Sequence, residues 1–394
     1  MQFNERKSTI AEYFEKAFGG QPEIWVRAPG RVDLMGSHTD YNMGFVMTMT
    51  VDQDTWIAAR PRLDRQVRLR SLNISGESCF SLDNIIHDNE ASWGNYIRGV
   101  AKVLMEAGYR LQGFDGIIHS TIPFGSGLSS SAALEMTSAL VFQQVSNFIL
   151  EPVQMALYGQ KAENEFVGVR TGILDQYSSA MGKEGCALQL DCLNLTSESV
   201  RIANGLQPVI CDTRARRNLV GSEYDDRRRQ CEEGVRFLKQ YYPEVQALRD
   251  ISLEQYATHE TEMPELIARR CRFIIEENQR VLDMAIALQR GDEDALANLY
   301  SSSYAGARDL FEIGAPAMDA MYHAAHDSPG IVACRQAGAG FGGCMVALVK
   351  ADQVEPFSQY VHNIYEENFG NAPRIFSATA SAGAGLLRDS IKNL

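Results

Sequence analysis

The first half of the chain alternates short apolar runs with longer stretches of helical periodicity. The runs are rich in β-branched and aromatic residues and several alternate apolar with polar positions, which is the pattern of strands. Six segments predict strands: 23–28, 45–51, 55–61, 66–71, 116–122 and 186–191. Three segments with apolar residues at three- and four-residue spacing predict helices: 93–107, 130–148 and 152–165.

The second half is richer in helical periodicity. It predicts five helices, at 224–241, 264–290, 292–312, 316–327 and 353–368, and one strand at 345–350. We place a boundary near residue 205, where the turn-forming sequence NGLQ separates the two compositions. The pattern predicts a mixed α/β (α+β) protein with two domains, 1–205 and 206–394.

Charge and cysteine content narrow the range of partners. Fifty acidic residues against 37 basic ones give a formal charge of −13, which disfavours nucleic acid and anionic membrane as partners. The eight cysteines are scattered without a CxxC pair, as expected of reduced thiols. The polar start of the chain is unlike a signal peptide, and no apolar run approaches the roughly 20 residues that span a bilayer. We therefore expect a cytoplasmic protein without a membrane partner.

A glycine- and serine-rich segment, PFGSGLSSSAALE at 123–135, joins a predicted strand to a predicted helix. The free N–H groups and positive dipole at a helix start favour an anion. Gly125 and Gly127 allow close backbone approach, and the hydroxyls of Ser129, Ser130 and Ser131 can contact phosphate or Mg²⁺. A glycine turn with one serine cap is the alternative, stabilising the helix by about 1 kcal/mol. The chain lacks GxxxxGK[ST], so this is not a P-loop.

A second glycine cluster, GAGFGG at 338–343, matches the dinucleotide pattern GxGxxG. That pattern requires a strand before it and a helix after it. Here a helix-like segment ending at Gly330 precedes the cluster, and the strand predicted at 345–350 follows it. We interpret the cluster as a tight loop near a ligand or near the first glycine loop.

Polar residues crowd the segment APGRVDLMGSHTDYNMG at 28–44. We expect Arg31, Asp33, His38 and Asp40 to lie in a loop between two strands, where such a group suits a hydroxyl-rich ligand. The alternatives are a turn or cap residue at Asp40, a half-buried histidine at His38 and a surface ion pair at Arg31.

Acidic residues mark a fourth segment, KAENEFVGVRTGILDQYSSAMG at 161–182. Glu163 and Glu165 end a predicted helix, and Asp175 follows Gly172 into a second, short helix. A carboxylate beside a phosphate site can bind Mg²⁺ or accept a proton from an attacking hydroxyl. A helix-capping role for Asp175 is the alternative.

Together these segments closely resemble the galactokinase family, within the GHMP group of homoserine, mevalonate and phosphomevalonate kinases. Six segments follow the family's order: APGRVDLMGSHTDYN, WGNYIRGV (93–100), PFGSGLSSSAALE, AENEFVGVRTGILDQYSSAMG, SEYDDRRRQCEEG (222–234) and AGAGFGGC (337–344). The resemblance implies an N-terminal domain of the ribosomal-protein-S5-domain-2-like fold and a ferredoxin-like C-terminal domain. It also implies ATP and Mg²⁺ as cofactors and a sugar as substrate.

The resemblance assigns roles to residues. Those expected around the nucleotide are Trp93 near the adenine and, around the phosphates, Gly125, Ser126, Gly127, Leu128, Ser129, Ser130 and Ser131. Those expected to bind Mg²⁺ are Ser131 and Glu163. Those expected around the sugar are Ser37, His38, Asp40, Gly172, Asp175 and Tyr224. The anomeric hydroxyl would lie between Arg31 and Asp175, where Asp175 can accept its proton and Arg31 can stabilise the developing alkoxide.

Departures from the family pattern bear on the substrate. Where galactokinases read NLIGEHTDYN, this chain reads DLMGSHTDYN, so Ser37 stands where the family has a glutamate that binds the C6 hydroxyl. D-Galactose, galacturonate and L-arabinose stay open as substrates. A non-catalytic sugar sensor is the alternative to an enzyme, but the intact serine loop and Asp175 favour catalysis. We expect a monomer, with a dimer as the alternative.

Overall fold

The first half of the protein, together with one short strand near the C-terminal end, builds an eight-stranded sheet. The computed structural model describes residues 2–215 and 222–387. The strands of this sheet are β1 (Ile24–Met35), β2 (Phe45–Pro61), β3 (Gln66–Ser71), β4 (Glu77–Ser81), β5 (Phe114–Ser120), β6 (Cys186–Asp191), β7 (Thr196–Arg201) and β12 (Gly385–Leu386). They run in the order β12-β1-β2-β5-β3-β4, with β6 pairing β2 and β7. The β3–β5 pair is parallel and the others are antiparallel.

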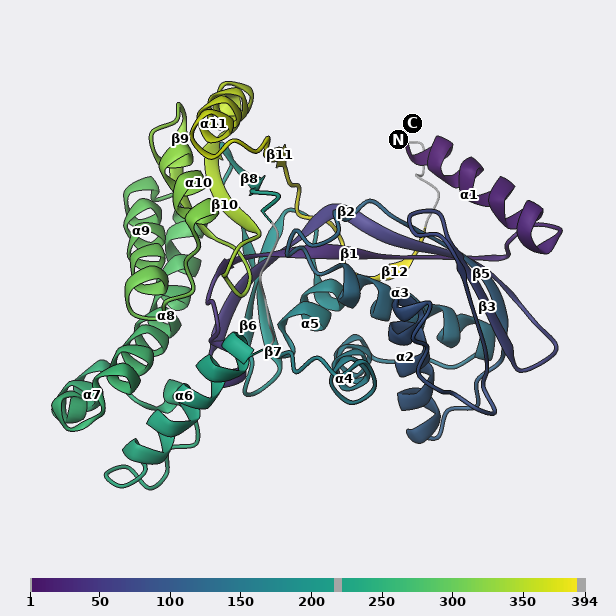
Figure 1. Cartoon of the computed structure of the whole chain (residues 1–394), viewed down its shortest axis with the longest axis horizontal. Helices are drawn as coiled ribbons and strands as arrows, with labels where there is room; N and C mark the ends of the chain where they lie inside the picture. The colour runs from purple at the N-terminus through teal and green to yellow at the C-terminus, as the bar shows by residue number, and fades with distance from the viewer. Residues whose placement is uncertain (1, 216–221, 388–394) are drawn as a thin grey trace.

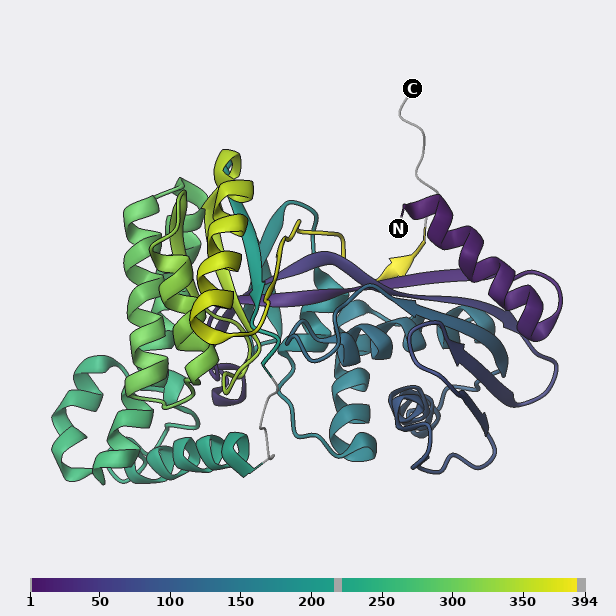
Figure 2. The same cartoon turned by 45° about the horizontal axis from the view of Figure 1, so that its top comes forward.

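Helices cover both faces of this sheet unequally. Four of them lie on one face, as Figures 1 and 2 show: α2 (Asn95–Glu106), α3 (Ser130–Ser146), α4 (Pro152–Ala162) and α5 (Leu174–Met181). Helix α1 (Phe3–Phe18) packs on the opposite face near β2 and β5. The apolar residues of β1, β2 and α3 form the largest core cluster, which continues into α8 at Val281 and Leu288.

The second half builds a four-stranded antiparallel sheet. Its strands, in spatial order, are β11 (Arg374–Ser377), β8 (Leu206–Asp212), β10 (Cys344–Lys350) and β9 (Ile331–Gln336). Its helices are α6 (Ser222–Leu238), α7 (Leu253–His259), α8 (Glu265–Arg290), α9 (Glu293–Asp309), α10 (Pro316–His326) and α11 (Val354–Phe369). The 3₁₀ turns are 40–42, 92–94, 248–250, 260–262 and 351–353, and a π-helical turn spans Glu163–Val167.

The predicted mixed α/β class is confirmed, and every predicted strand and helix has a counterpart. The helix expected before the glycine cluster is α10, but a strand that was not predicted, β9, separates it from the cluster. One detail was wrong. Arg31 and Asp33 lie on β1, where a loop was expected, because β1 continues through Pro29 and Gly30 with a register shift at that point. Proline and glycine are tolerated in a strand at such an irregularity.

The predicted boundary at residue 205 lies between β7 and β8, which belong to different sheets. The end of the chain crosses back, because β12 pairs with β1 through Val26 and Arg27. The division into domains 1–205 and 206–394 therefore stays a prediction.

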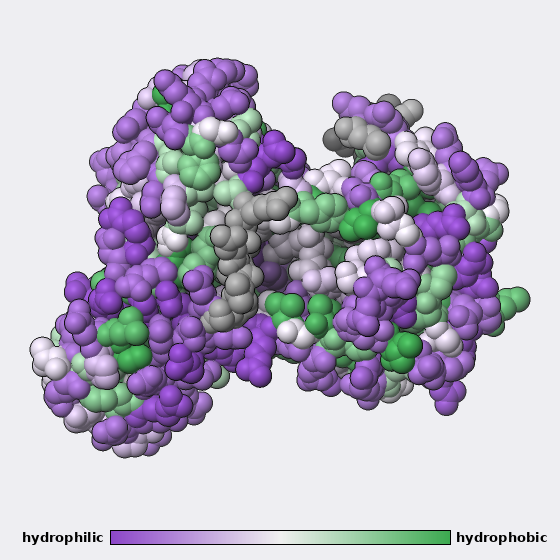
Figure 3. Space-filling model, in the orientation of Figure 1, coloured by the Kyte–Doolittle hydropathy of each residue, from purple (hydrophilic) through white to green (hydrophobic). Residues whose placement is uncertain are grey.

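In the described part of the chain, no helix is both long enough and apolar enough to cross a membrane. The face shown in Figure 3 is mostly hydrophilic, and its apolar residues form small, separate patches.

Candidate active site

A cavity of about 590 Å³ brings five segments of the chain together. They are β1 with the turn after it, the glycine-serine loop before α3, the segment 168–175, the start of α6 and the loop after β9. Seventeen lining residues come from the first half of the chain and four from the second half, namely Tyr224, Asp225, Gly338 and Ala339. The four motif segments of the sequence therefore meet at one place.

Arg31 and Asp175 form an ion pair in this cavity. Arg31 donates from Nε and Nη2 to Asp175 Oδ1, at 2.8 and 2.5 Å. Ser129 donates to the other oxygen, Oδ2, at 2.6 Å. Asp175 is 22% exposed at its side chain, so a substrate can reach the carboxylate. Burial lowers the pKa of Arg31, but Asp175 and Asp33 more than reverse this and leave its pKa raised, which keeps the guanidinium charged.

The glycine-serine loop is held against β1 in an unusual backbone conformation. Gly125, Gly127 and Ser129 have φ of 74°, 83° and 57°. Arg31 fixes the loop twice, donating from its backbone N–H to Leu128 O at 3.1 Å and from Nη1 to Gly127 O at 2.6 Å. The loop ends at the start of α3, so the unpaired N–H groups of that helix face the cavity.

The loop residues predicted around the nucleotide do not all line the cavity. Five of them do: Gly125, Gly127, Ser129, Ser130 and Ser131. The side chains of Ser126 and Leu128 are buried, each about 1% exposed. Ser126 donates to Pro123 O at 2.8 Å, within the loop itself.

A second pocket, of about 170 Å³, adjoins the first at Ser130 and Ser131. Trp93, Tyr96, Ile74 and Phe124 are among its lining residues, giving it the apolar and aromatic walls that suit a planar base. The indole Nε1 of Trp93 is buried without a hydrogen-bond partner among the described residues. The predicted placement of adenine near Trp93 fits this geometry and stays a prediction.

Asp40 and Gly172 both line the cavity and contact each other there. A Cβ on residue 172 would lie 1.7 Å from Asp40 Oδ2, so glycine is required for this approach. Burial raises the pKa of Asp40 to about 6, aided by the negative charges of Asp175 and Asp33, while the Tyr41 backbone N–H and Arg31 oppose the shift. A carboxylate this desolvated gains most from a hydroxyl donor.

His38 lines the cavity, and both of its ring nitrogens have hydrogen-bond partners within the protein. Its Nε2 donates to Ala339 O at 2.9 Å, so the neutral ring accepts from the Tyr41 hydroxyl at Nδ1, at 2.8 Å. Burial lowers the pKa of His38 to about 4. Its ring packs 5.2 Å from that of Tyr224, which also lines the cavity from the first turns of α6. His38 is therefore suited to shaping the site rather than to proton transfer.

Ser37 is turned away from this cavity. Its hydroxyl accepts from Arg335 Nη2 at 2.8 Å, and its backbone N–H donates to Glu277 Oε1 at 3.3 Å. Arg335 and Glu277 are fully buried and paired at 3.1 Å. Ser37 is 2% exposed and is not among the residues that line the cavity. Its predicted contact with the sugar is the one least supported by the geometry.

Asp33 lines the cavity, as expected of the polar group at 28–44, although the family resemblance gave it no role. Its Oδ1 lies 3.2 Å from Arg31 Nε, and its Oδ2 accepts from the Gly338 N–H at 3.1 Å. Burial raises the pKa of Asp33, and Asp175 adds to the shift. Its position two residues after Arg31 on one strand face was the available signal. The bond to Gly338 also places the second glycine cluster beside the cavity, as predicted.

Ser131 and Glu163 lie together at the phosphate end. The Ser131 hydroxyl bonds to the Glu163 carboxylate, which is 3% exposed. Burial raises the pKa of Glu163, while the bonds from Thr171 and Ser131 oppose this. The described residues hold no group of three or more His, Cys, Asp or Glu side chains that could bind a metal. One carboxylate and one hydroxyl fit Mg²⁺, which takes its remaining ligands from water and phosphate.

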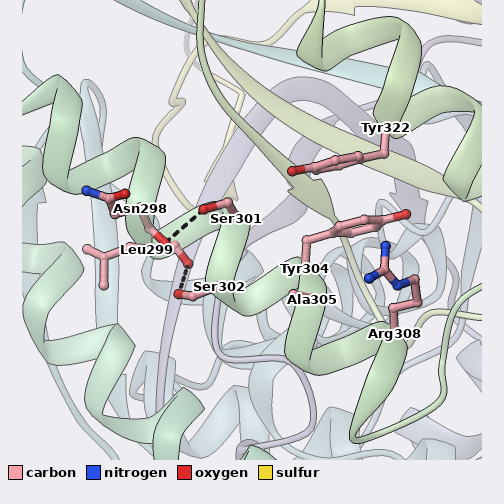
Figure 4. Close-up of a pocket in the computed structure, with 8 residues that line it drawn as sticks. All are labelled: Asn298, Leu299, Ser301, Ser302, Tyr304, Ala305, Arg308 and Tyr322. Carbon is pink, nitrogen blue, oxygen red and sulfur yellow. Dashed lines mark hydrogen bonds between the residues drawn. The ribbon is translucent and has the colours of Figure 1, made fainter.

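A shallow hollow between α9 and α10 (Figure 4) is larger, about 710 Å³. It shares no lining residue with the cavity. Tyr304 and Tyr322 stack there at 3.8 Å, and Tyr322 also stacks on His326. Ser301 and Ser302 donate to carbonyls of their own helix. The serine hydroxyls are thus bonded to the backbone and the aromatic rings are stacked, so the hollow carries none of the chemistry above.

Comparison with known proteins agrees with the motifs. Residues 12–61 match the profile of the galactokinase galactose-binding signature, and residues 95–183 match that of the GHMP kinase N-terminal domain. Galactokinase of a Roseiflexus species is 42% identical over 97% of this chain and 98% of that protein. Galactokinase of Chloroflexus aggregans is 42% identical over 95% and 96%.

Solved structures point the same way. The galactokinase of Lactococcus lactis in complex with galactose superposes with a TM-score of 0.92, at 33% identity, over 96% of this chain and 99% of that one. A mevalonate kinase shares the fold at a TM-score of 0.63 and 16% identity, over 91% and 99%. The predicted resemblance and the predicted two-domain GHMP kinase fold are thus confirmed. The chain belongs to the galactokinase family of the GHMP kinases, and it is a kinase.

Proposed function

We propose that the protein transfers the γ-phosphoryl group of ATP to the anomeric hydroxyl of D-galactose, or of a close relative with an axial C4 hydroxyl. The products are the sugar 1-phosphate and ADP. One observation carries the proposal: the carboxylate of Asp175 lies in the same cavity as the amide-lined loop and is bonded to Ser129 of that loop. A proton acceptor and a phosphate cradle therefore adjoin each other.

The pocket at Trp93 would hold the base, and the loop at 125–131 the phosphates. The two cavities meet at Ser130 and Ser131, so one nucleotide can span both. The backbone N–H groups at the start of α3 face the phosphate oxygens and counter their charge. A Mg²⁺ ion bound at Ser131 and Glu163 would offset the negative charge of the phosphate oxygens.

At the sugar end, Asp175 accepts the proton of the anomeric hydroxyl as its oxygen attacks phosphorus. Arg31 stays charged beside that oxygen and stabilises the alkoxide as it develops. The ion pair also fixes the rotamer of Asp175, so the base is positioned before substrate arrives. Asp40 and Tyr224 supply an acceptor and a hydroxyl for the other sugar oxygens, while His38 holds the wall behind them.

Charge argues against a uronic acid as the substrate. The cavity is lined by Asp33, Asp40, Asp175 and Asp225, against Arg31 and Arg170. Arg31 is already engaged by two of the carboxylates. A sugar carboxylate would therefore meet mostly negative groups, whereas neutral hydroxyls meet acceptors.

The test is ADP release measured with D-galactose, galacturonate, L-arabinose and galactosamine, with phosphorus NMR to locate the ester. We expect galactose to give the highest kcat/KM and an anomeric phosphate. Greater turnover of galacturonate or L-arabinose would identify that sugar, and not galactose, as the substrate. Binding of ATP and sugar without ADP release would identify a sensor instead of an enzyme.

A further inference from the structure

Two buried residues behind the phosphate end have no role in the chemistry described above. Glu135 lies on α3, one helical turn after Ser131 and on the same face. Gln176 lies on α5, next to Asp175. Both are 0% exposed. They therefore reach from the two helices that carry a phosphate-loop serine and the proton acceptor.

The amide of Gln176 joins two carboxyl groups. Its Nε2 donates to Glu135 Oε2 at 2.9 Å and to Glu163 Oε2 at 2.8 Å, using both of its hydrogens. A flipped amide would turn its oxygen toward Glu163 Oε2, which already accepts from Thr171, so the contact with Glu163 favours the orientation described. Thr171 also donates to Glu163 Oε2, at 2.7 Å. The bonds from Gln176 and Thr171 thus both go to Oε2 and leave Oε1 for a cation, which Ser131 would also bind.

This arrangement is less stable than an apolar core of the same volume would be. Glu135 Oε1 and Gln176 Oε1 are buried without a hydrogen-bond partner among the described residues. Each such group costs about 1–3 kcal/mol, and apolar residues of similar volume would pack there without that penalty. Glu163 itself begins a π-helical turn, a rare geometry that is frequent at functional sites.

We propose that Glu135 and Gln176 form a buried bracket that positions the carboxylate of Glu163 and so sets the affinity of the site for the nucleotide-bound divalent cation. The bracket rests on the proposed function only in taking Glu163 as a cation ligand. Gln176 orients the carboxylate, and Glu135 orients Gln176. They are positioning residues, since neither lines the cavity in which the reaction would occur.

The test is calorimetric titration of the full chain with the imido analogue of ATP, at a series of Mg²⁺ concentrations and in EDTA. Gln176→Met removes the amide at similar length, and Glu135→Leu removes the acceptor. We expect both variants to need about 10–100 times more Mg²⁺ for half-maximal enhancement of binding, the usual effect of losing a group that orients a metal ligand. Binding in EDTA should match wild type.

Two variants serve as controls. Glu135→Gln keeps an oxygen that accepts the bond from Gln176, so its Mg²⁺ dependence should stay near wild type. Gln143→Leu removes a side-chain bond at the far end of the same helix, where Gln143 accepts from the Leu150 N–H at 2.9 Å, and should also leave it unchanged. If Glu135→Leu does not fold, Gln176→Met and Glu135→Gln still decide.

Wild-type Mg²⁺ dependence in Gln176→Met would overturn the bracket, and so would a loss in Glu135→Gln as large as that in Gln176→Met. The titration involves no sugar and no turnover. A wild-type protein that binds the analogue with Mg²⁺ but phosphorylates no sugar would refute the proposed function alone.

Discussion

Arg31 and Asp175 are joined by two hydrogen bonds that converge on one carboxylate oxygen, Oδ1. The remaining terminal nitrogen of Arg31, Nη1, donates a hydrogen bond to the carbonyl oxygen of Gly127. One guanidinium therefore connects the proton acceptor to the phosphate loop. A movement of that loop would change the position of the Asp175 carboxylate. The other oxygen of Asp175 is held by Ser129 of the same loop.

Asp175→Asn should keep ATP and sugar binding but lose turnover by about 10²–10⁴-fold, because an amide cannot accept the proton of the anomeric hydroxyl. Steady-state kinetics gives the turnover, and calorimetry gives the two affinities. Asp225→Asn is the matched control, since Asp225 lines the same cavity at an exposed position and should leave turnover near wild type. Wild-type turnover in Asp175→Asn would show that another group accepts the proton.

Ser129 allows the hydroxyl and the backbone to be tested separately. It has φ of 57°, where a side chain is strained by about 1–2 kcal/mol. Ser129→Ala loses the bond to Asp175 and keeps the strain, while Ser129→Gly loses the bond and relieves the strain. We expect equal losses of turnover in the two variants, with the higher Tm in the glycine variant. Full activity in Ser129→Ala would mean that the hydroxyl does not orient Asp175.

The sequence predicted most of this site because its residues sit in continuous motifs. The segments from Gly125 to Ser131 and from Gly172 to Asp175 are each continuous in sequence. A glycine turn or a helix start has the same local properties in any protein, so it can be recognised without knowing distant contacts. Most helix positions were predictable for the same reason, since amphipathic spacing is a local property, although α1 and α7 were not predicted. The strand β9 was missed because its six residues, IVACRQ, are short and directly follow the turn at Gly330.

What the sequence could not predict are contacts between distant segments. Glu277 lies 240 positions from Ser37, and Arg335 lies 298 positions from it, yet the three share hydrogen bonds. A buried glutamate in the middle of α8 looks like any polar residue of an amphipathic helix until its partners are known. The role of Ser37 was therefore predicted from the motif around it in sequence, whereas its hydrogen-bond partners in the structure come from α8 and β9.

Asp40 should give the enzyme a pH dependence. Its pKa of about 6 in the folded protein exceeds the usual 3.8, so folding favours the protonated form. This contribution to stability is complete below the unfolded pKa and is lost as pH rises through about 6. Asp40→Asn should therefore raise the unfolding free energy relative to wild type above pH 6, and the gain should shrink toward pH 4.

Sugar binding should show the opposite trend. The ionised Asp40 is the better acceptor for a sugar hydroxyl, so KM for the sugar in wild type should rise as pH falls below about 6. Asp40→Asn should remove this part of the pH profile, while KM for ATP should be unaffected. The measurements are urea unfolding and KM from pH 5 to 8. The same pH profile of KM in both proteins would exclude Asp40 as its source.

Ser37→Glu should destabilise the fold rather than retune the sugar site. The new carboxylate would enter a buried place where Arg335 is already shared with Glu277, both fully buried. An uncompensated buried charge costs about 3–5 kcal/mol, which should appear in urea unfolding. Ser37→Gln has the same size without the charge and should be less destabilised. Adding Glu277→Gln to Ser37→Glu should recover part of the loss, since one carboxylate then pairs with Arg335. If Ser37→Glu instead keeps wild-type stability and shifts preference toward sugars with a C6 hydroxyl, the side chain at position 37 faces the sugar and not Arg335.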